Sequence, residues 1–317
     1  MQSRKPLWYA VGTASLAAVI ALGVGVARAQ KPALTAGVNS DTSSSVSSSS
    51  PSVSPSGPAS TPSSPSGGSG ASDAGVDTRA IEDALQAYVD DRGGDAAVAV
   101  YDRTTGTSIS VNGSDEFQTA SIVKVDIVAA LMLQKQAAGA ALTAQEKAWA
   151  KAALTVSDND AASSLYREIG GASGLRAANA TLGLRETTPD SSWGMTTTTA
   201  DDQIRLLDAI SGAGGPLSAA NRALLAGWMS SVTAEQRFGV TAGADESAEE
   251  VYVKVGWVDL DDQNGLWATN SVGRVVEDDH DWLIAVLSDH NESFASGKKL
   301  ITGIVTEAMD RLRAADQ

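Results

Sequence analysis

Hydrophobic residues recur at helical spacing where the folded part of this chain is expected to begin. Ile81, Leu85, Tyr88 and Val89 fall on one face of a helix, and polar residues fall on the other. The pair Gly93-Gly94 follows directly and is typical of a helix end. The pattern therefore predicts an amphipathic helix that packs one face against a core.

A hairpin and then a long helical region are predicted next. Residues 96–101 and 107–111 are strand-like apolar runs, and Thr104-Thr105-Gly106 between them is typical of a tight turn. Helical spacing then dominates from Ser121 to about Leu225, with glycines at the predicted helix ends.

Strand-like runs return near the end of the chain, at 251–255, 266–271 and 282–288, and residues 300–312 have the spacing of a closing helix. The order of helix, strands, many helices, strands and helix predicts an α+β fold. This order of elements fits an antiparallel sheet that is built from both chain ends, has flanking helices and is joined to a central all-helical subdomain.

The amino-terminal segment has the pattern of an export signal. Arg4 and Lys5 precede an apolar run at 7–26, and Ala27-Arg28-Ala29 has the small-x-small form of a signal-peptidase site. We therefore predict a signal peptide or an uncleaved membrane anchor at 1–29. Either one places the rest of the chain in the extracellular space or the cell envelope.

Residues 30–75 are predicted to be a disordered linker. Most of this segment is Ser, Pro and Gly, so it cannot bury enough apolar surface to offset the entropy of ordering. The remaining residues, 76–317, suit one catalytic domain, which we expect to be a monomer.

The amino-acid composition limits the kinds of partner that the protein is expected to bind. The formal net charge is −15, which disfavours nucleic acid and anionic surfaces. The chain has no cysteine, so neither disulfides nor a lipid-modified cysteine are expected. Its two histidines lie outside any metal-binding motif, and we expect no metal and no cofactor. The membrane is expected as a partner only through the amino-terminal segment.

The stretch Ser121-Ile122-Val123-Lys124 carries the first candidate chemistry. Residues three apart share a helical face, and this face continues through Val125, Val128 and Met132, so Lys124 projects toward the apolar side. Desolvation lowers the pKa of an amine, which would allow Lys124 to accept the Ser121 proton. The alternative interpretation is a surface lysine on a core helix.

Two more motifs follow in order. Ser157-Asp158-Asn159 comes after a polar break, and Lys254-Val255-Gly256 ends a strand-like run before Trp257. Each has a plain structural alternative. Ser157 is a plausible helix N-cap, and Lys254 could be a surface residue of a strand.

With S-x-x-K, S-D-N and K-x-G in this order, the chain from about 76 to 317 resembles the penicillin-recognising serine enzymes. It is most similar to class A β-lactamases and their actinobacterial serine-hydrolase relatives. The resemblance implies the two-part fold described above. It also implies that Ser121 is the nucleophile, that Lys124 activates it, and that Ser157 relays a proton to the leaving amine with Lys254 close by.

The same resemblance implies a set of substrate-binding residues. Asn159 would hold the substrate amide, Gly256 belongs to the third motif, and the backbone amides of Ser121 and Trp257 match the oxyanion-hole positions. Arg237 lies in the general region from which class A enzymes often place an arginine near the substrate carboxylate.

The pattern departs from the family in two places. The E-x-x-L-N motif, whose glutamate drives water onto the acyl-enzyme, is missing; Glu186 or Asp190 could substitute, or could belong to a polar turn. Val255 stands where the family usually has Thr or Ser, so a hydrogen bond to the substrate carboxylate worth about 1.5–3 kcal/mol is expected to be lost.

We therefore expect an exported, class A β-lactamase-like serine hydrolase that forms an acyl-enzyme with a β-lactam or a peptidoglycan stem peptide and deacylates slowly. The alternatives are a D,D-peptidase-like acyl hydrolase of changed substrate and a catalytically weak, wall-associated binding domain. A Ser-His-Asp triad is disfavoured, because His280 and His290 lie in acidic segments without a G-x-S-x-G motif.

Overall fold

A computed structural model describes residues 76–316 except 93–94, 261–263 and 278. The predicted export segment at 1–29 and the predicted linker at 30–75 therefore lie outside the described residues. No helix of the described part of the chain is long and apolar enough to cross a membrane.

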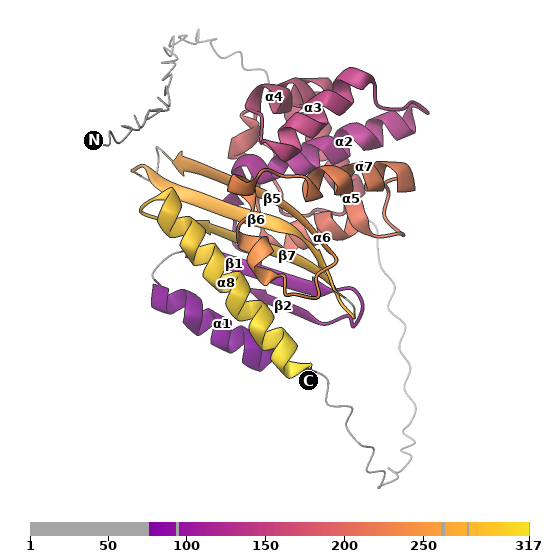
Figure 1. Ribbon diagram of the computed structural model, residues 1–317. Coiled ribbons are helices and arrows are strands. Elements are labelled where there is room, and N and C mark those ends of the chain that lie inside the picture. Colours follow the sequence, from indigo (N-terminus) through magenta and orange to yellow (C-terminus); the bar gives the residue numbers. More distant parts are fainter. Residues whose placement is uncertain (1–75, 93–94, 261–263, 278, 317) are drawn as a thin grey trace, which may run out of the picture. The chain divides into compact units, whose positions relative to one another are not determined.

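A five-stranded antiparallel sheet forms the centre of the domain, with strand order β2-β1-β7-β6-β5 (Figure 1). The first two strands come from the beginning of the domain and the other three from its end, as predicted. The last three are longer than predicted, so Trp257 lies inside β5. The strands are β1 (Asp95–Asp102), β2 (Ser108–Val111), β5 (Glu250–Leu260), β6 (Leu266–Val276) and β7 (Asp281–Asp289).

The two faces of the sheet pack against different layers, because side chains alternate along a strand. In β1, Val98 and Val100 join a core cluster with the terminal helices, whereas Ala97 and Ala99 join a second cluster with the central helices. The terminal layer consists of α1 (Thr78–Arg92) and α8 (Phe294–Ala315), which lie side by side over one face (Figure 1).

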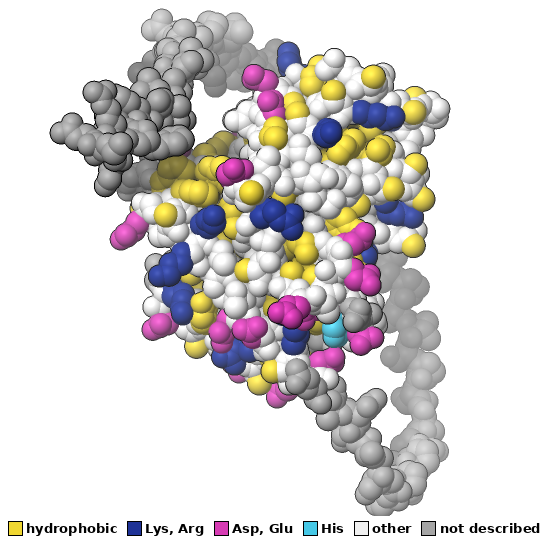
Figure 2. All heavy atoms as spheres, in the orientation of Figure 1, with side chains coloured by type: hydrophobic (Ala, Val, Ile, Leu, Met, Phe, Trp, Pro, Cys, Tyr) yellow, Lys and Arg dark blue, Asp and Glu magenta, His cyan; other side chains and the backbone are white. Residues whose placement is uncertain are grey.

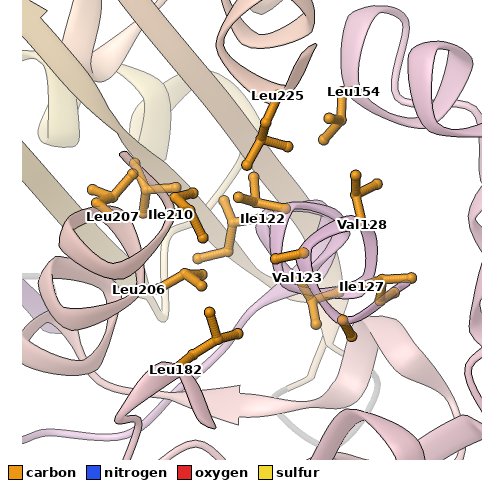
Figure 3. Close-up of a cluster of buried hydrophobic side chains, with 14 of the residues drawn as sticks. Ile122, Val123, Ile127, Val128, Leu154, Leu182, Leu206, Leu207, Ile210 and Leu225 are labelled. Carbon is orange, nitrogen blue, oxygen red and sulfur yellow. The ribbon is translucent and has the colours of Figure 1, made fainter. Parts of the chain in front are cut away.

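The central helices form the predicted all-helical subdomain around α2 (Val123–Ala137). The first ten residues of α2 are buried on every side, so the predicted single apolar face is wrong for this helix. Leucines and isoleucines of α3, α5, α6 and α7 converge on its first turns (Figure 3). These helices are α3 (Ala144–Thr155), α4 (Asn159–Glu168), α5 (Gly171–Leu182), α6 (Ala200–Ser211) and α7 (Ala219–Ser230).

Short elements connect the sheet to the helical subdomain. The pair β3 (Phe117–Gln118) and β4 (Thr197–Thr198) forms a small second sheet, and four 3₁₀ turns occur among the described residues. These turns are η1 (Ala120–Ile122), η2 (Trp193–Met195), η3 (Ala234–Gln236) and η4 (Gly239–Gly243). Three of the four contribute residues to the site described below.

The surface agrees with the acidic composition. On the face drawn in Figure 2, carboxylate side chains gather over the half formed by the sheet and α8, while the half formed by the central helices shows more hydrophobic side chains. Lysines and arginines are scattered over both halves, so this face has no continuous basic stripe of the kind that binds nucleic acid.

Candidate active site

Ser121 lies on the 3₁₀ turn η1, directly before α2, and not within the helix as its spacing to Lys124 suggested. Ala120 precedes it with φ of 46°, in the left-handed region that side-chain-bearing residues rarely occupy. The Ser121 side chain is half-buried and lines a pocket of about 290 Å³. The strained turn therefore presents a serine at the mouth of a small cavity.

Lys124 is fully buried in the first turn of α2. Its Nζ donates to the Ser157 carbonyl oxygen at 2.7 Å, to Ser157 Oγ at 3.1 Å and to Asn159 Oδ1 at 2.7 Å. Burial lowers the pKa of Lys124 to about 8, while the charge of Asp158 acts in the opposite direction. An amine with this pKa can act as a general base near neutral pH. Because Lys124 is fully buried, the interpretation as a surface lysine is wrong.

Lys124 does not point at Ser121 in this conformation. Within the described part of the chain, the Ser121 hydroxyl forms no hydrogen bond. The three protons of a charged amine are matched by three oxygen acceptors on the second motif. Lys124 must therefore lose a proton, and turn away from one of these acceptors, before it can accept a proton from Ser121.

Ser157 lies at the centre of the polar network. It has φ of 57°, and its Oγ accepts from both Lys124 and Lys254 at 3.1 Å each. The interpretation of Ser157 as the helix N-cap is wrong, because Asp158 occupies that position and accepts from the Ala161 amide at 2.7 Å. Because Asp158 caps the helix, the Ser157 hydroxyl can contact the two lysines instead.

Lys254 is fully buried on β5, so the interpretation as a surface strand residue is also wrong. Besides Ser157 Oγ, its Nζ donates to the Val255 carbonyl oxygen at 2.7 Å and to Gln236 Oε1 at 3.3 Å. Burial lowers the pKa of Lys254 well below its ordinary value, and the nearby charge of Lys124 lowers it further. Gln236 was not predicted, since a single glutamine in a loop carries no recognisable sequence signal.

Gly256 allows β5 to approach the serine turn closely. A Cβ at this position would lie 2.6 Å from the Ser121 backbone nitrogen and 2.8 Å from that of Ile122, which no side chain can tolerate. β5 is the edge strand of the sheet, so its outer backbone groups face the pocket rather than another strand. The predicted oxyanion positions on Ser121 and Trp257 are thereby brought to one place.

Side chains alternate along a strand, so Val255 and Trp257 both lie on the side of the sheet that faces the terminal helices. Val255 is fully buried in the core cluster of the terminal helices, and the Trp257 ring packs against Phe238 and Phe294 at centroid distances of 6.1 and 4.9 Å. The Val255 side chain does not line the pocket. Its predicted effect on carboxylate binding stays a prediction.

The pocket is lined by neutral residues. One of its aromatic residues is Trp193, whose ring centroid lies 4.8 Å from Lys124 Nζ and whose Nε1 donates to Ser163 Oγ at 3.1 Å. The described lining offers no carboxylate, imidazole or thiolate that would ligate a metal ion. It comprises Ala120, Ser121, Asn159, Ser192, Trp193, Gly194, Met195, Trp257 and Val258.

The two acids considered as substitutes for the missing glutamate lie elsewhere. Glu186 Oε2 accepts from Thr199 Oγ1 at 3.4 Å, and Asp190 Oδ1 accepts from the Ser192 amide at 2.7 Å. Both side chains are exposed, and neither lines the pocket. This geometry matches the polar-turn interpretation.

Arg237 is also outside the pocket lining. Its side chain is exposed, and within the described residues its guanidinium has no hydrogen-bond or ion-pair partner. It directly follows Gln236, which reaches Lys254. Its role as a carboxylate ligand stays a prediction.

A half-exposed serine lies near two buried lysines that both donate to a second serine, where a sheet flanked by helices meets a helical subdomain. This arrangement is the one that defines the class of penicillin-recognising serine enzymes. The comparison with known families agrees. A model described as the β-lactamase enzyme family matches residues 80–148 and 132–312, and the chain belongs to this family.

Solved structures share the fold. PBP-A superposes with a TM-score of 0.65 at 20% identity, covering 74% of this chain and 96% of that one. The TLA-1 extended-spectrum β-lactamase superposes with a TM-score of 0.67 at 19% sequence identity, covering 74% of this chain and 99% of that one. A class A β-lactamase from Mycobacterium abscessus superposes with a TM-score of 0.61 at 20% sequence identity, covering 75% of this chain and 100% of that one. The predicted β-lactamase-like fold is therefore confirmed.

A relative among curated proteins is the Mycobacterium tuberculosis protein named "Putative lipoprotein LppW", which is 30% identical over 174 residues. The match covers 52% of this chain and 55% of that protein. The chain thus spans about half the length of the curated relatives it matches.

Proposed function

We propose that the chain is an exported serine hydrolase that is acylated at Ser121 by a β-lactam or a D-alanyl-peptide-like amide and is deacylated slowly. One observation carries the proposal. Both buried lysines converge on the Ser157 hydroxyl, and Asn159, which also accepts from Lys124, lines the same pocket as Ser121. Two buried amines on one hydroxyl cost stability and are expected where they serve proton transfer.

In the proposed acylation, Ser121 Oγ attacks the substrate carbonyl carbon and its proton passes to neutral Lys124. The negative charge that develops on the carbonyl oxygen is held by the backbone N–H groups of Ser121 and Trp257. Loss of one such donor typically costs about 2.7–4 kcal/mol of transition-state stabilisation. The carbon–nitrogen bond then breaks, and Ser157 passes a proton, resupplied by the lysines, to the leaving nitrogen.

Slow deacylation follows from the neutral lining of the pocket. Hydrolysis of the ester needs a base that activates water, and Glu186 and Asp190 lie outside the pocket lining, where they accept from Thr199 and Ser192. Trp193, not a carboxylate, faces Lys124. A long-lived acyl-enzyme is the expected result. A variant of the structural neighbour PBP-A has itself been solved as an acyl-enzyme complex with penicillin G.

A D,D-peptidase-like hydrolase of changed substrate is the second candidate, since the same groups would cleave a peptide amide. Because both lysines and Ser157 form a complete network, a domain that merely binds the cell wall is less well supported. Export is proposed from residues 1–29, and the lipoprotein name of the mycobacterial relative supports a location in the cell envelope.

The test is intact mass spectrometry of the protein after brief exposure to a penicillin, followed over time beside a chromogenic cephalosporin assay. We expect one adduct per chain, a lifetime much longer than the acylation time, and complete loss of the adduct in Ser121→Ala. Ser191→Ala, which removes an exposed serine outside the pocket lining, should label normally. An adduct that persists in Ser121→Ala would place the nucleophile elsewhere.

A further inference from the structure

Two carboxylates face each other at one end of the sheet. Asp95 is the first residue of β1 and Asp289 the last residue of β7, and the strand register pairs them directly. Like charges in directly opposed positions destabilise a sheet, so a positive group is expected between them. His290, the next residue along the chain, supplies it.

The arrangement around His290 differs from an ordinary ion pair. Its Nδ1 lies 2.9 Å from Asp95 Oδ2 and 2.9 Å from Asp289 Oδ1. One ring nitrogen carries at most one proton, so Nδ1 of His290 can donate to only one of the two carboxylates at a time.

His280 provides an internal comparison, because it also contacts two aspartates. Its Nδ1 lies 2.8 Å from Asp102 Oδ2, and its Nε2 lies 3.3 Å from Asp316 Oδ2. Each carboxylate therefore has its own ring nitrogen, on opposite sides of the imidazole. Because the two carboxylates lie against different ring nitrogens, the three groups cannot converge on one ion.

We propose that Asp95, Asp289 and His290 form a binding site for a divalent transition-metal ion of the zinc type. The three donor atoms lie within 4.8 Å of one another. Zinc binds imidazole nitrogen and carboxylate oxygen at about 2.0–2.2 Å, which separates neighbouring ligand atoms by roughly 3.3 Å in a tetrahedron. The observed 2.9 Å contacts need to open by only a few tenths of an ångström.

The exchange balances simply. The ion takes the place of the proton on Nδ1, that proton is released to solvent, and both carboxylates gain a direct ligand bond. An imidazole in the donor set favours zinc and its neighbours over calcium and magnesium, which prefer oxygen ligands alone. Water can occupy the fourth position, since the Asp95 and His290 side chains are exposed.

The charged side chains around the site do not by themselves attract a cation. His290 opens onto a groove between α1 and α8 that is also lined by Arg92, Lys299 and Glu292. Two of these three side chains are positive, so the groove does not concentrate cations. Binding of the ion then depends on direct ligation by all three donors, so removal of any one of them should lower the affinity for zinc strongly. A bound ion would join the start of β1 to the end of β7.

The test uses the full chain without an added histidine tag, zinc titration calorimetry and thermal unfolding with and without zinc. We expect one ion per chain and a higher Tm, because the ion binds the folded state. His290→Asn, which keeps a residue that tolerates the left-handed φ of 53°, and Asp95→Asn should each weaken binding about tenfold or more.

The matched control is His280→Asn, which removes the other histidine and should leave zinc affinity unchanged. Circular dichroism of each variant checks that the fold is retained. Equal zinc affinity in His290→Asn, Asp95→Asn and the unmodified chain would overturn the proposal, as would the absence of any ion bound with unit stoichiometry.

Discussion

At the scale of single residues, the chemistry rests on two amines whose environment differs from that of an ordinary lysine. Lys124 and Lys254 are fully buried, and no carboxylate among the described residues forms an ion pair with either. Burial penalises the ammonium form of both lysines more than nearby charges stabilise it, which is why both pKa values fall. The protonation state of Lys124 should therefore change near pH 8.

The first prediction concerns Asp158, whose charge raises the pKa of Lys124 against the effect of burial. Asp158→Asn removes that charge but keeps an effective helix cap. The pKa of Lys124 should fall below about 8, so the rise of acylation rate with pH should move to lower pH. Stopped-flow acylation from pH 6 to 9 measures the shift. Asp160→Asn, the next acid of the same helix turn, serves as control, and an equal shift there would refute the assignment.

A second prediction concerns the exposed acids of the loop before β4. Because Glu186 and Asp190 are bound to Thr199 and Ser192 outside the pocket, neither should activate water. Glu186→Gln and Asp190→Asn are each expected to change the acyl-enzyme lifetime by less than about threefold, a difference below 1 kcal/mol. Time-resolved intact mass measures that lifetime. A lifetime lengthened tenfold or more in either variant would identify a deacylation base.

At the scale of elements, the site depends on how closely β5 approaches η1. Gly256→Ala would place a methyl group 2.6 Å from the Ser121 nitrogen, so strand and turn must separate. We expect acylation to fall at least about tenfold, with a loss of roughly 1–3 kcal/mol of unfolding free energy, as is usual for overpacking. Urea denaturation and labelling rates measure the two effects.

The control for this prediction is Gly227→Ala, an exposed position of α7 where an added Cβ meets nothing within 4 Å. Alanine favours a helix over glycine by up to about 1 kcal/mol, so stability should stay equal or rise. Comparable loss of labelling in both variants would show that the effect at Gly256 is not local to the site.

Several elements were predictable from local pattern and several were not. The hairpin of β1 and β2, with Gly106 at φ of 79°, and the closing helix follow directly from the spacing of apolar residues. The strained Ala120 and Ser157, and the position of Ser121 on a 3₁₀ turn, do not. Such conformations are imposed by surrounding packing, which overrides the preferences of the residues themselves.

At the scale of the whole molecule, the composition of the amino-terminal segment makes a prediction of its own. Residues 41–74 are rich in Ser, Pro and Gly, and the family match begins at residue 80. Limited proteolysis of the full chain should therefore trim it to a core that begins near Val76. Mass spectrometry of the fragment locates its start. Resistance of the segment to several proteases would contradict the linker hypothesis.

The spacing of apolar residues determined the order of elements, and the three motifs determined the family and the identity of the chemical groups, because each of these signals is encoded by residues close together in the chain. Tertiary structure alone decided which of these groups meet. Ser157 turns toward the lysines because Asp158 takes the helix cap, and Gln236 and Trp193 contact the lysines from loops distant in sequence. Asp95, Asp289 and His290 converge only through the register of β1 and β7. Contacts between distant segments depend on packing of the whole domain, and no local pattern encodes them.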